Sequence, residues 1–185
     1  MIPVHIWGLK LPAGTRYLNL ELAELNNEPF RFHMPLVHEP DELDDLPNLV
    51  IDINSEILKA KGLPNVHILF LDSTNARLSS EKIRECCLQV IQFAYFCTKS
   101  HILFCDLTGP TITDEDSSQL SSKVHQDLRR LTAQWSCYAS YIDLFEVIQP
   151  NHWVNNFKLG RQGQEVLAKV INRTLLGTPT EVFNL

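Results

Sequence analysis

Short, mainly apolar runs alternate along the chain with longer segments in which apolar residues recur at helical spacing. Short runs rich in Val, Ile, Leu and Phe predict strands that are buried on both faces of a sheet. The run over 30–37 contains Pro35, and proline within a sheet is confined to edge positions. The predicted strands span 4–7, 30–37, 66–71, 101–107 and 138–145.

Helical spacing of apolar residues marks four longer segments. The first is followed by Gly-Leu-Pro at 62–64, a sequence typical of a helix end. The second begins at Ser79 or Ser80, either of which can cap a helix that carries Glu81 in its first turn. The predicted helices span 43–58, 80–94, 113–131 and 160–176.

This alternation of strands and helices predicts an α/β fold. We expect a three-layer α/β/α sandwich with about five parallel strands in flavodoxin-like order. The expected single domain covers 1–177, and 178–185 forms a short tail. Ligands of such sheets bind at the carboxyl ends of the strands. Candidate functional residues should therefore follow the predicted strand ends Trp7, Leu71, Leu107 and Phe145.

Composition narrows the range of possible functions. The chain has 185 residues, 44% of them hydrophobic, which suits one ordinary globular domain. Its five cysteines form no CxxC motif, so we expect free thiols, no zinc or other metal site, and no cofactor. We find no signal peptide and no apolar run of membrane-spanning length, and therefore expect a cytoplasmic protein without a membrane partner.

Three segments resemble the SGNH (GDSL-like) hydrolases. The segment 65–76 looks like the family's strand followed by Gly-x-Asn-Asp, and 154–171 looks like its Asp-x-x-His-Leu block. The first predicted strand ends in Gly-Leu-Lys-Leu at 8–11, where the family has Gly-Asp-Ser-Leu. The resemblance covers nearly the whole chain and implies an SGNH-type fold.

The departures from this family concern its catalytic residues. The resemblance places the nucleophilic serine on Lys10, the catalytic aspartate on Asn155 and the catalytic histidine on Lys158. It places the oxyanion glycine on Ser73, while the oxyanion asparagine is retained as Asn75. A serine nucleophile needs a base and an orienting carboxylate. We therefore expect no hydrolase activity, no catalytic residues and no small-molecule substrate.

An SGNH-like domain without a triad is similar to the OSK domains of insect germ-plasm proteins, a resemblance that implies RNA binding. Basic residues near the strand ends and the last helix could contact phosphate. The net charge of −6 means that such binding would be local and sensitive to salt. The sequence thus predicts a non-catalytic RNA-binding scaffold with RNA and protein partners, through Lys10, Arg16, Arg77, Lys158 and Arg161.

Two alternatives remain open. Between residues 39 and 56 every charged residue is an acid, and this stretch could serve a protein-interaction module without RNA binding. The second alternative is an active esterase with a shifted site. In that case His152 would be the base, with Asp143 nearby in sequence.

Overall fold

The computed structural model describes residues 2–8, 30–32, 36–37, 46–71, 78–97, 99–106, 115–155 and 158–178. Its main sheet has the order β2-β1-β4-β5-β6, and every pair of neighbouring strands is parallel. Strand β3 also pairs with β1, further along the edge that β2 occupies, so the sheet is five positions wide. The strands are β1 Ile2–Gly8, β2 Phe30–Phe32, β3 Leu36–Val37, β4 Asn65–Leu71, β5 Ser100–Asp106 and β6 Ala139–Asp143.

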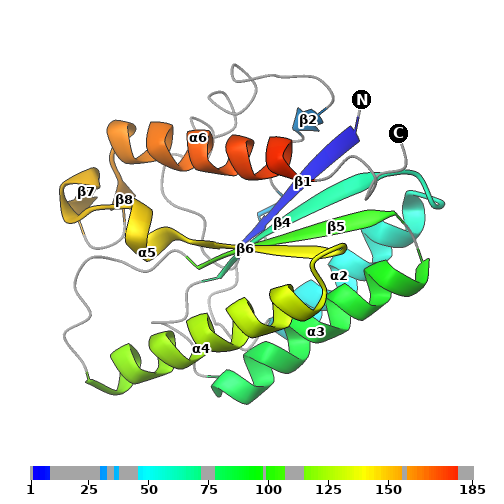
Figure 1. Ribbon diagram of the computed structural model, residues 1–185, viewed down its shortest axis with the longest axis horizontal. Helices are drawn as coiled ribbons and strands as arrows, with labels where there is room; N and C mark the ends of the chain where they lie inside the picture. Colours follow the sequence, from blue (N-terminus) through cyan, green and yellow to red (C-terminus); the bar gives the residue numbers. More distant parts are fainter. Residues whose placement is uncertain are drawn as a thin grey trace.

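Helices cover both faces of this sheet (Figure 1). Helices α2 (Leu46–Lys59), α3 (Ser80–Cys97) and α4 (Glu115–Gln134) lie on one face. Helix α6 (Arg161–Gly177) lies on the other, and the short α5 (Leu144–Val147) follows β6 directly. The prediction of a three-layer α/β/α sandwich with a parallel sheet in flavodoxin-like order is confirmed.

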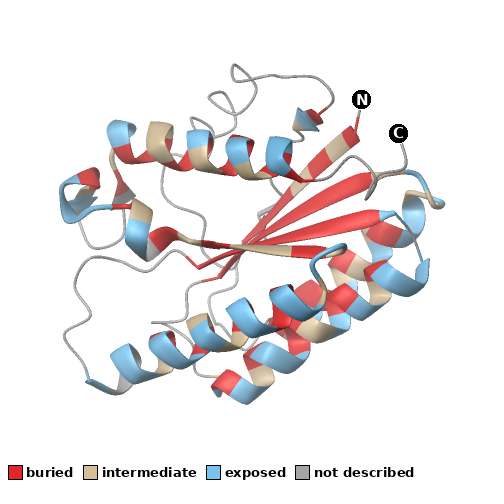
Figure 2. Cartoon of the chain, viewed as in Figure 1, coloured by how far each residue is buried: buried red, intermediate tan, exposed pale blue. Residues whose placement is uncertain are grey.

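The central strands are apolar on both faces because each face packs against helices. In β4, Ile68 and Phe70 contact the core beneath α6. Leu69 and Leu71 point to the opposite face and pack with α2 and α3. Figure 2 shows these strands as the most continuously buried part of the chain. This two-sided burial explains why the central strands appear in the sequence as unbroken apolar runs.

Near two predicted elements, the structure differs from the sequence prediction. The strand predicted over 138–145 stops at Asp143, and the next residues form α5. The last helix begins at Arg161, whereas Lys158 belongs to a two-residue strand, β8 (Lys158–Leu159). Strand β8 pairs antiparallel with β7 (Trp153–Asn155), which follows the short 3-10 helix η3 (Pro150–His152). The resemblance to the SGNH hydrolases implied that Lys158 lies at the start of the last helix, and this is wrong, because Lys158 lies in the hairpin before it.

A buried polar network joins β1, β4 and β5 inside the sheet. Trp7 Nε1 donates to His67 Nδ1 at 3.0 Å, so the proton of the neutral His67 ring lies on Nε2, which contacts Asn65 Oδ1 at 2.8 Å. The Ser100 hydroxyl donates to the same Asn65 oxygen at 2.7 Å. Burial, and secondly the charge of His5, lowers the pKa of His67 to about 3. His67 is therefore a neutral structural residue.

This network predicts loss of stability in acid. The unfolded chain protonates His67 near its ordinary pKa of about 6.5, whereas the folded chain resists protonation until about pH 3. Between these two pKa values, unfolding takes up a proton. As the pH is lowered through this range, the free energy of unfolding therefore falls by about 1.4 kcal/mol per pH unit. Urea titrations of wild type and His67→Gln from pH 7 to pH 4 measure this slope. If the free energy of unfolding depended equally on pH in both proteins, the low pKa of His67 would be contradicted.

Candidate active site

Two neighbouring strands of the sheet each end in an aspartate at the carboxyl edge. Asp106 is the last residue of β5, Asp143 is the last residue of β6, and the strand register places them opposite one another. Asp106 is fully buried, and the Asp143 side chain is 17% exposed. This is the edge at which ligands bind in sheets of this kind.

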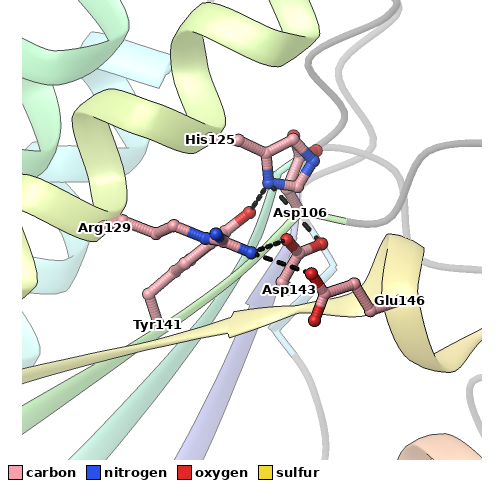
Figure 3. Close-up of polar contacts among 6 residues, drawn as sticks. All are labelled: Asp106, His125, Arg129, Tyr141, Asp143 and Glu146. Atoms are coloured by element: carbon pink, nitrogen blue, oxygen red, sulfur yellow. Dashed lines mark hydrogen bonds and ion pairs between the residues drawn. The ribbon is translucent and has the colours of Figure 1, made fainter.

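A histidine from α4 lies between these two carboxylates (Figure 3). Nε2 of His125 is 3.9 Å from Asp106 Oδ2, and Nδ1 is 3.7 Å from Asp143 Oδ1. The His125 side chain is 15% exposed, so it is largely shielded and still reaches solvent. A histidine flanked by carboxylates in a partly exposed position has the surroundings of a catalytic base.

Tyr141 approaches the same imidazole from β6. Its hydroxyl hydrogen-bonds with His125 Nδ1, and the two rings meet edge to face with centroids 5.6 Å apart. Tyr141 and Asp143 are two residues apart on one strand, so both point toward α4. Burial, followed by the charges of Asp106 and Asp143, raises the pKa of Tyr141. The phenol is therefore protonated at neutral pH.

Arg129 lies one helical turn after His125 and faces the same edge. Its guanidinium pairs with Asp143 Oδ2 and, at 3.2 Å, with Glu146 Oε1 from α5. These partners, Asp143 first, raise the pKa of Arg129. Asp143 thus contacts Arg129 through Oδ2 while its Oδ1 faces His125. We call these six side chains the carboxyl-edge cluster: Asp106, His125, Arg129, Tyr141, Asp143 and Glu146.

His152 has a different environment. It belongs to η3 and is 9% exposed, and its Cβ lies close to Gly163. The backbone N–H of Gln149 donates to its Nδ1 at 3.0 Å. Because Nδ1 is an acceptor, a neutral His152 ring carries its proton on Nε2 and has no free nitrogen to accept another. These contacts give His152 a structural role in closing η3 against α6.

Five of the residues that the sequence nominated cannot be placed from the structure. Lys10, Arg16, Ser73, Asn75 and Arg77 lie outside the described residues. The resemblance implies that Lys10 and Lys158 lie close together at the carboxyl end of the sheet, and this stays a prediction. Asn155 and Lys158 pair with each other in the β7–β8 hairpin. Arg161 starts α6 on the surface and donates to Glu165 Oε1 at 3.2 Å.

Sequence reasoning missed the centre of the carboxyl-edge cluster. Asp106 was overlooked because the strand was predicted to continue to Leu107, one residue too far. His125 occupies a polar position of an amphipathic helix, which the sequence alone cannot distinguish from a solvent-facing position. Arg129 was not among the basic residues predicted to bind a ligand, and Asp143 was considered only with His152. Strand ends placed one residue earlier would have pointed to Asp106.

Within the described ranges, we find no three His, Cys, Asp or Glu side chains arranged to hold a metal ion. A separate check of the helices in those ranges finds none that combines the length and apolar character of a membrane span.

Comparisons with known proteins show what the chain resembles. No family model matches the sequence, and no curated protein matches it. A lipolytic protein of the G-D-S-L family from Veillonella parvula superposes with a TM-score of 0.69 at 13% identity, over 96% of this chain and 100% of its own. TesA gives 0.65 at 13% identity, over 94% and 97%. The psychrotrophic esterase EstA from Pseudoalteromonas gives 0.65 at 6%, over 96% and 100%.

These comparisons overturn the predicted function. The expectation of a non-catalytic RNA-binding scaffold is contradicted, because the similar structures include a lipolytic protein and an esterase, and no comparison points to RNA. The expectation that the chain is not an enzyme is contradicted on the same ground. The resemblance to OSK domains receives no support, and protein partners remain untested. At these identities the likeness shows architecture: the chain has the fold of the SGNH (GDSL-like) hydrolases.

Proposed function

We propose that this chain hydrolyses carboxylic esters at the carboxyl edge of its sheet, with His125 as the general base. The observation that carries the proposal is the position of His125 between the carboxylates of Asp106 and Asp143. Histidine is the commonest base in hydrolysis, and a carboxylate neighbour stabilises the imidazolium that forms when it accepts a proton. The fold supports the proposal, because esterases are among the structures that share it.

His125 is a better candidate for the base than His152. His125 belongs to the edge where parallel sheets bind ligands, and two acids approach it. His152 is tied to the Gln149 backbone through the nitrogen that would have to remain free. Asp143, the acid considered for His152, points instead to His125 and Arg129.

Hydrolysis of p-nitrophenyl acetate by the purified chain tests the proposal. We expect turnover above the uncatalysed rate, and a loss of about 10²–10⁴-fold in kcat/KM for His125→Gln, the usual contribution of a general base. Lys123→Ala is the matched control, because Lys123 is an exposed residue of the same helix that pairs with Glu81 on the surface. It should leave kcat/KM unchanged.

A His152→Gln variant distinguishes the two candidate bases. We expect it to lower the melting temperature, since His152 is buried against α6, and to retain turnover below that temperature. Loss of turnover in folded His152→Gln, with activity retained in His125→Gln, would move the site to η3. Turnover no faster than the buffer rate would reject the proposed function altogether.

The location and descent of the chain are further proposals. We propose a cytoplasmic location, supported by five cysteines that form no disulfide with one another. We also retain kinship with OSK domains as a proposal about descent alone, because it rests on the sequence positions of Lys10, Asn155 and Lys158. Ester turnover that depends on the carboxyl-edge cluster would separate this chain from those domains in function.

A further inference from the structure

We propose that Tyr141 is the nucleophile of this site, and that Asp106, His125 and Tyr141 form a carboxylate–imidazole–phenol triad. This inference rests on the proposed ester hydrolysis and assigns the group that attacks the substrate. A catalytic nucleophile is recognised by a hydrogen bond to its base, with the base oriented by a third group. The described part of the chain meets these requirements at His125.

The contacts of the two imidazole nitrogens define the order of the triad. Nδ1 of His125 meets the Tyr141 hydroxyl, while Nε2 on the opposite side of the ring faces Asp106 Oδ2 at 3.9 Å. The phenol keeps its proton and can donate it to Nδ1, and the proton of the neutral ring then lies on Nε2, the nitrogen that faces Asp106. In a serine triad, Nε2 contacts the nucleophile and Nδ1 contacts the carboxylate. Here the two ring nitrogens exchange these roles.

A tyrosine in this position requires such a base. Its raised pKa keeps the hydroxyl protonated, so a phenolate forms only as His125 removes the proton during attack. Asp143 lies 3.7 Å from Nδ1 and stabilises the resulting imidazolium, and Arg129 keeps Asp143 in place. All three members of the triad sit on regular elements, β5, α4 and β6, which hold them more rigidly than loops would.

Two other places where a nucleophile could be expected do not provide one. The first strand is followed by Leu-Lys-Leu at 9–11, with no hydroxyl or thiol among them. Among the described cysteines, Cys105 adjoins Asp106 in β5 but is fully buried, and burial raises the pKa of its thiol. Tyr141 is a half-buried hydroxyl residue at the carboxyl edge that contacts the proposed base directly.

The reaction proceeds through an acyl-tyrosine. The Tyr141 oxygen bonds to the ester carbonyl carbon as its proton passes to His125 Nδ1. The tetrahedral intermediate then breaks its bond to the leaving alkoxide, which takes that proton and departs as the alcohol. A water molecule next attacks the acyl-tyrosine carbonyl while giving a proton to Nδ1. The phenolate leaves, recovers the proton from His125, and the carboxylic acid is released.

Trapping the intermediate tests this assignment. The chain is mixed with p-nitrophenyl acetate, quenched in acid within the first turnover and mapped by peptide mass spectrometry. We expect one acetyl group, on Tyr141, and a burst of nitrophenol equal to the enzyme concentration. Tyr141→Phe should remove both label and burst and lower kcat/KM by at least about 10²-fold. Tyr138→Phe is the matched control, because Tyr138 packs in an aromatic group with Tyr95 and Trp135 away from His125.

The outcomes separate this inference from the proposed function. Turnover that survives in Tyr141→Phe, or an acetyl group on a serine or threonine, would overturn the tyrosine assignment and leave the esterase intact. Acetylation of Tyr141 without turnover would support the nucleophile and reject hydrolysis. Neither label nor turnover would reject both. Melting curves for each variant confirm that a loss of activity is not a loss of fold.

Discussion

Replacing Asp106 by asparagine should lower kcat for ester hydrolysis by about 10²–10⁴-fold, as expected when the carboxylate partner of a catalytic histidine becomes an amide. Asp106 is fully buried and lies 3.9 Å from Nε2 of His125. The amide keeps the size of the side chain but cannot stabilise the imidazolium, and its N–H group can force the proton of the ring onto Nδ1. The nitrogen that should accept from Tyr141 would then be occupied.

The division of this effect between kcat and KM reveals the role of Asp106. A buried carboxylate does not touch the substrate, so KM should stay within about twofold of wild type while kcat falls. Asp127→Asn removes an acid from the same helix as His125 and should change neither constant. A rise in KM with an unchanged kcat would show that Asp106 affects substrate binding instead.

The largest expected effect on stability comes from the centre of the sheet. Phe104 lies in β5 with no exposed surface and packs in the core between the sheet and the helices α2, α3 and α4. Phe104→Ala should lower the free energy of unfolding by about 3–5 kcal/mol, through lost burial and the cavity that remains. In urea the transition midpoint should fall while the slope stays constant.

An exposed phenylalanine provides the comparison for Phe104. Phe96 is 78% exposed near the end of α3, so Phe96→Ala removes the same atoms from water instead of from the core. We expect a change within about 0.5 kcal/mol. Equal effects at the two positions would mean that β5 is not an interior strand of the folded protein.

Local sequence was sufficient for the elements that are buried most uniformly. The apolar runs over 68–71 in β4 and over 102–105 in β5 predicted strands, since a strand covered on both faces is mainly apolar. The helical spacing in α2 and the Gly-Leu-Pro after it predicted both the helix and its end. Ser79 was one of two candidate caps, and its hydroxyl accepts from the Lys82 backbone N–H at 3.2 Å.

Local sequence failed where neighbours in space decide the conformation. Lys158 precedes a strong helical pattern, yet it pairs with Asn155 across a hairpin. The end of β6 at Asp143 follows from a change of direction into α5, which apolar residues on both sides of the boundary conceal. In both cases the competing structures are similar in intrinsic propensity, and tertiary contacts select between them.

The sequence by itself determined the α/β architecture and the parallel sheet, because these depend on the order and periodicity of apolar residues, and its resemblance to the SGNH hydrolases implied their layout. Only the tertiary structure decided the candidate site. Asp106, His125 and Tyr141 come from three separate elements, and no motif links their spacing. Parallel pairing aligns the ends of β5 and β6, and packing of α4 turns His125 toward them. Catalytic geometry of this kind depends on register and helix packing, neither of which leaves a local pattern in the chain.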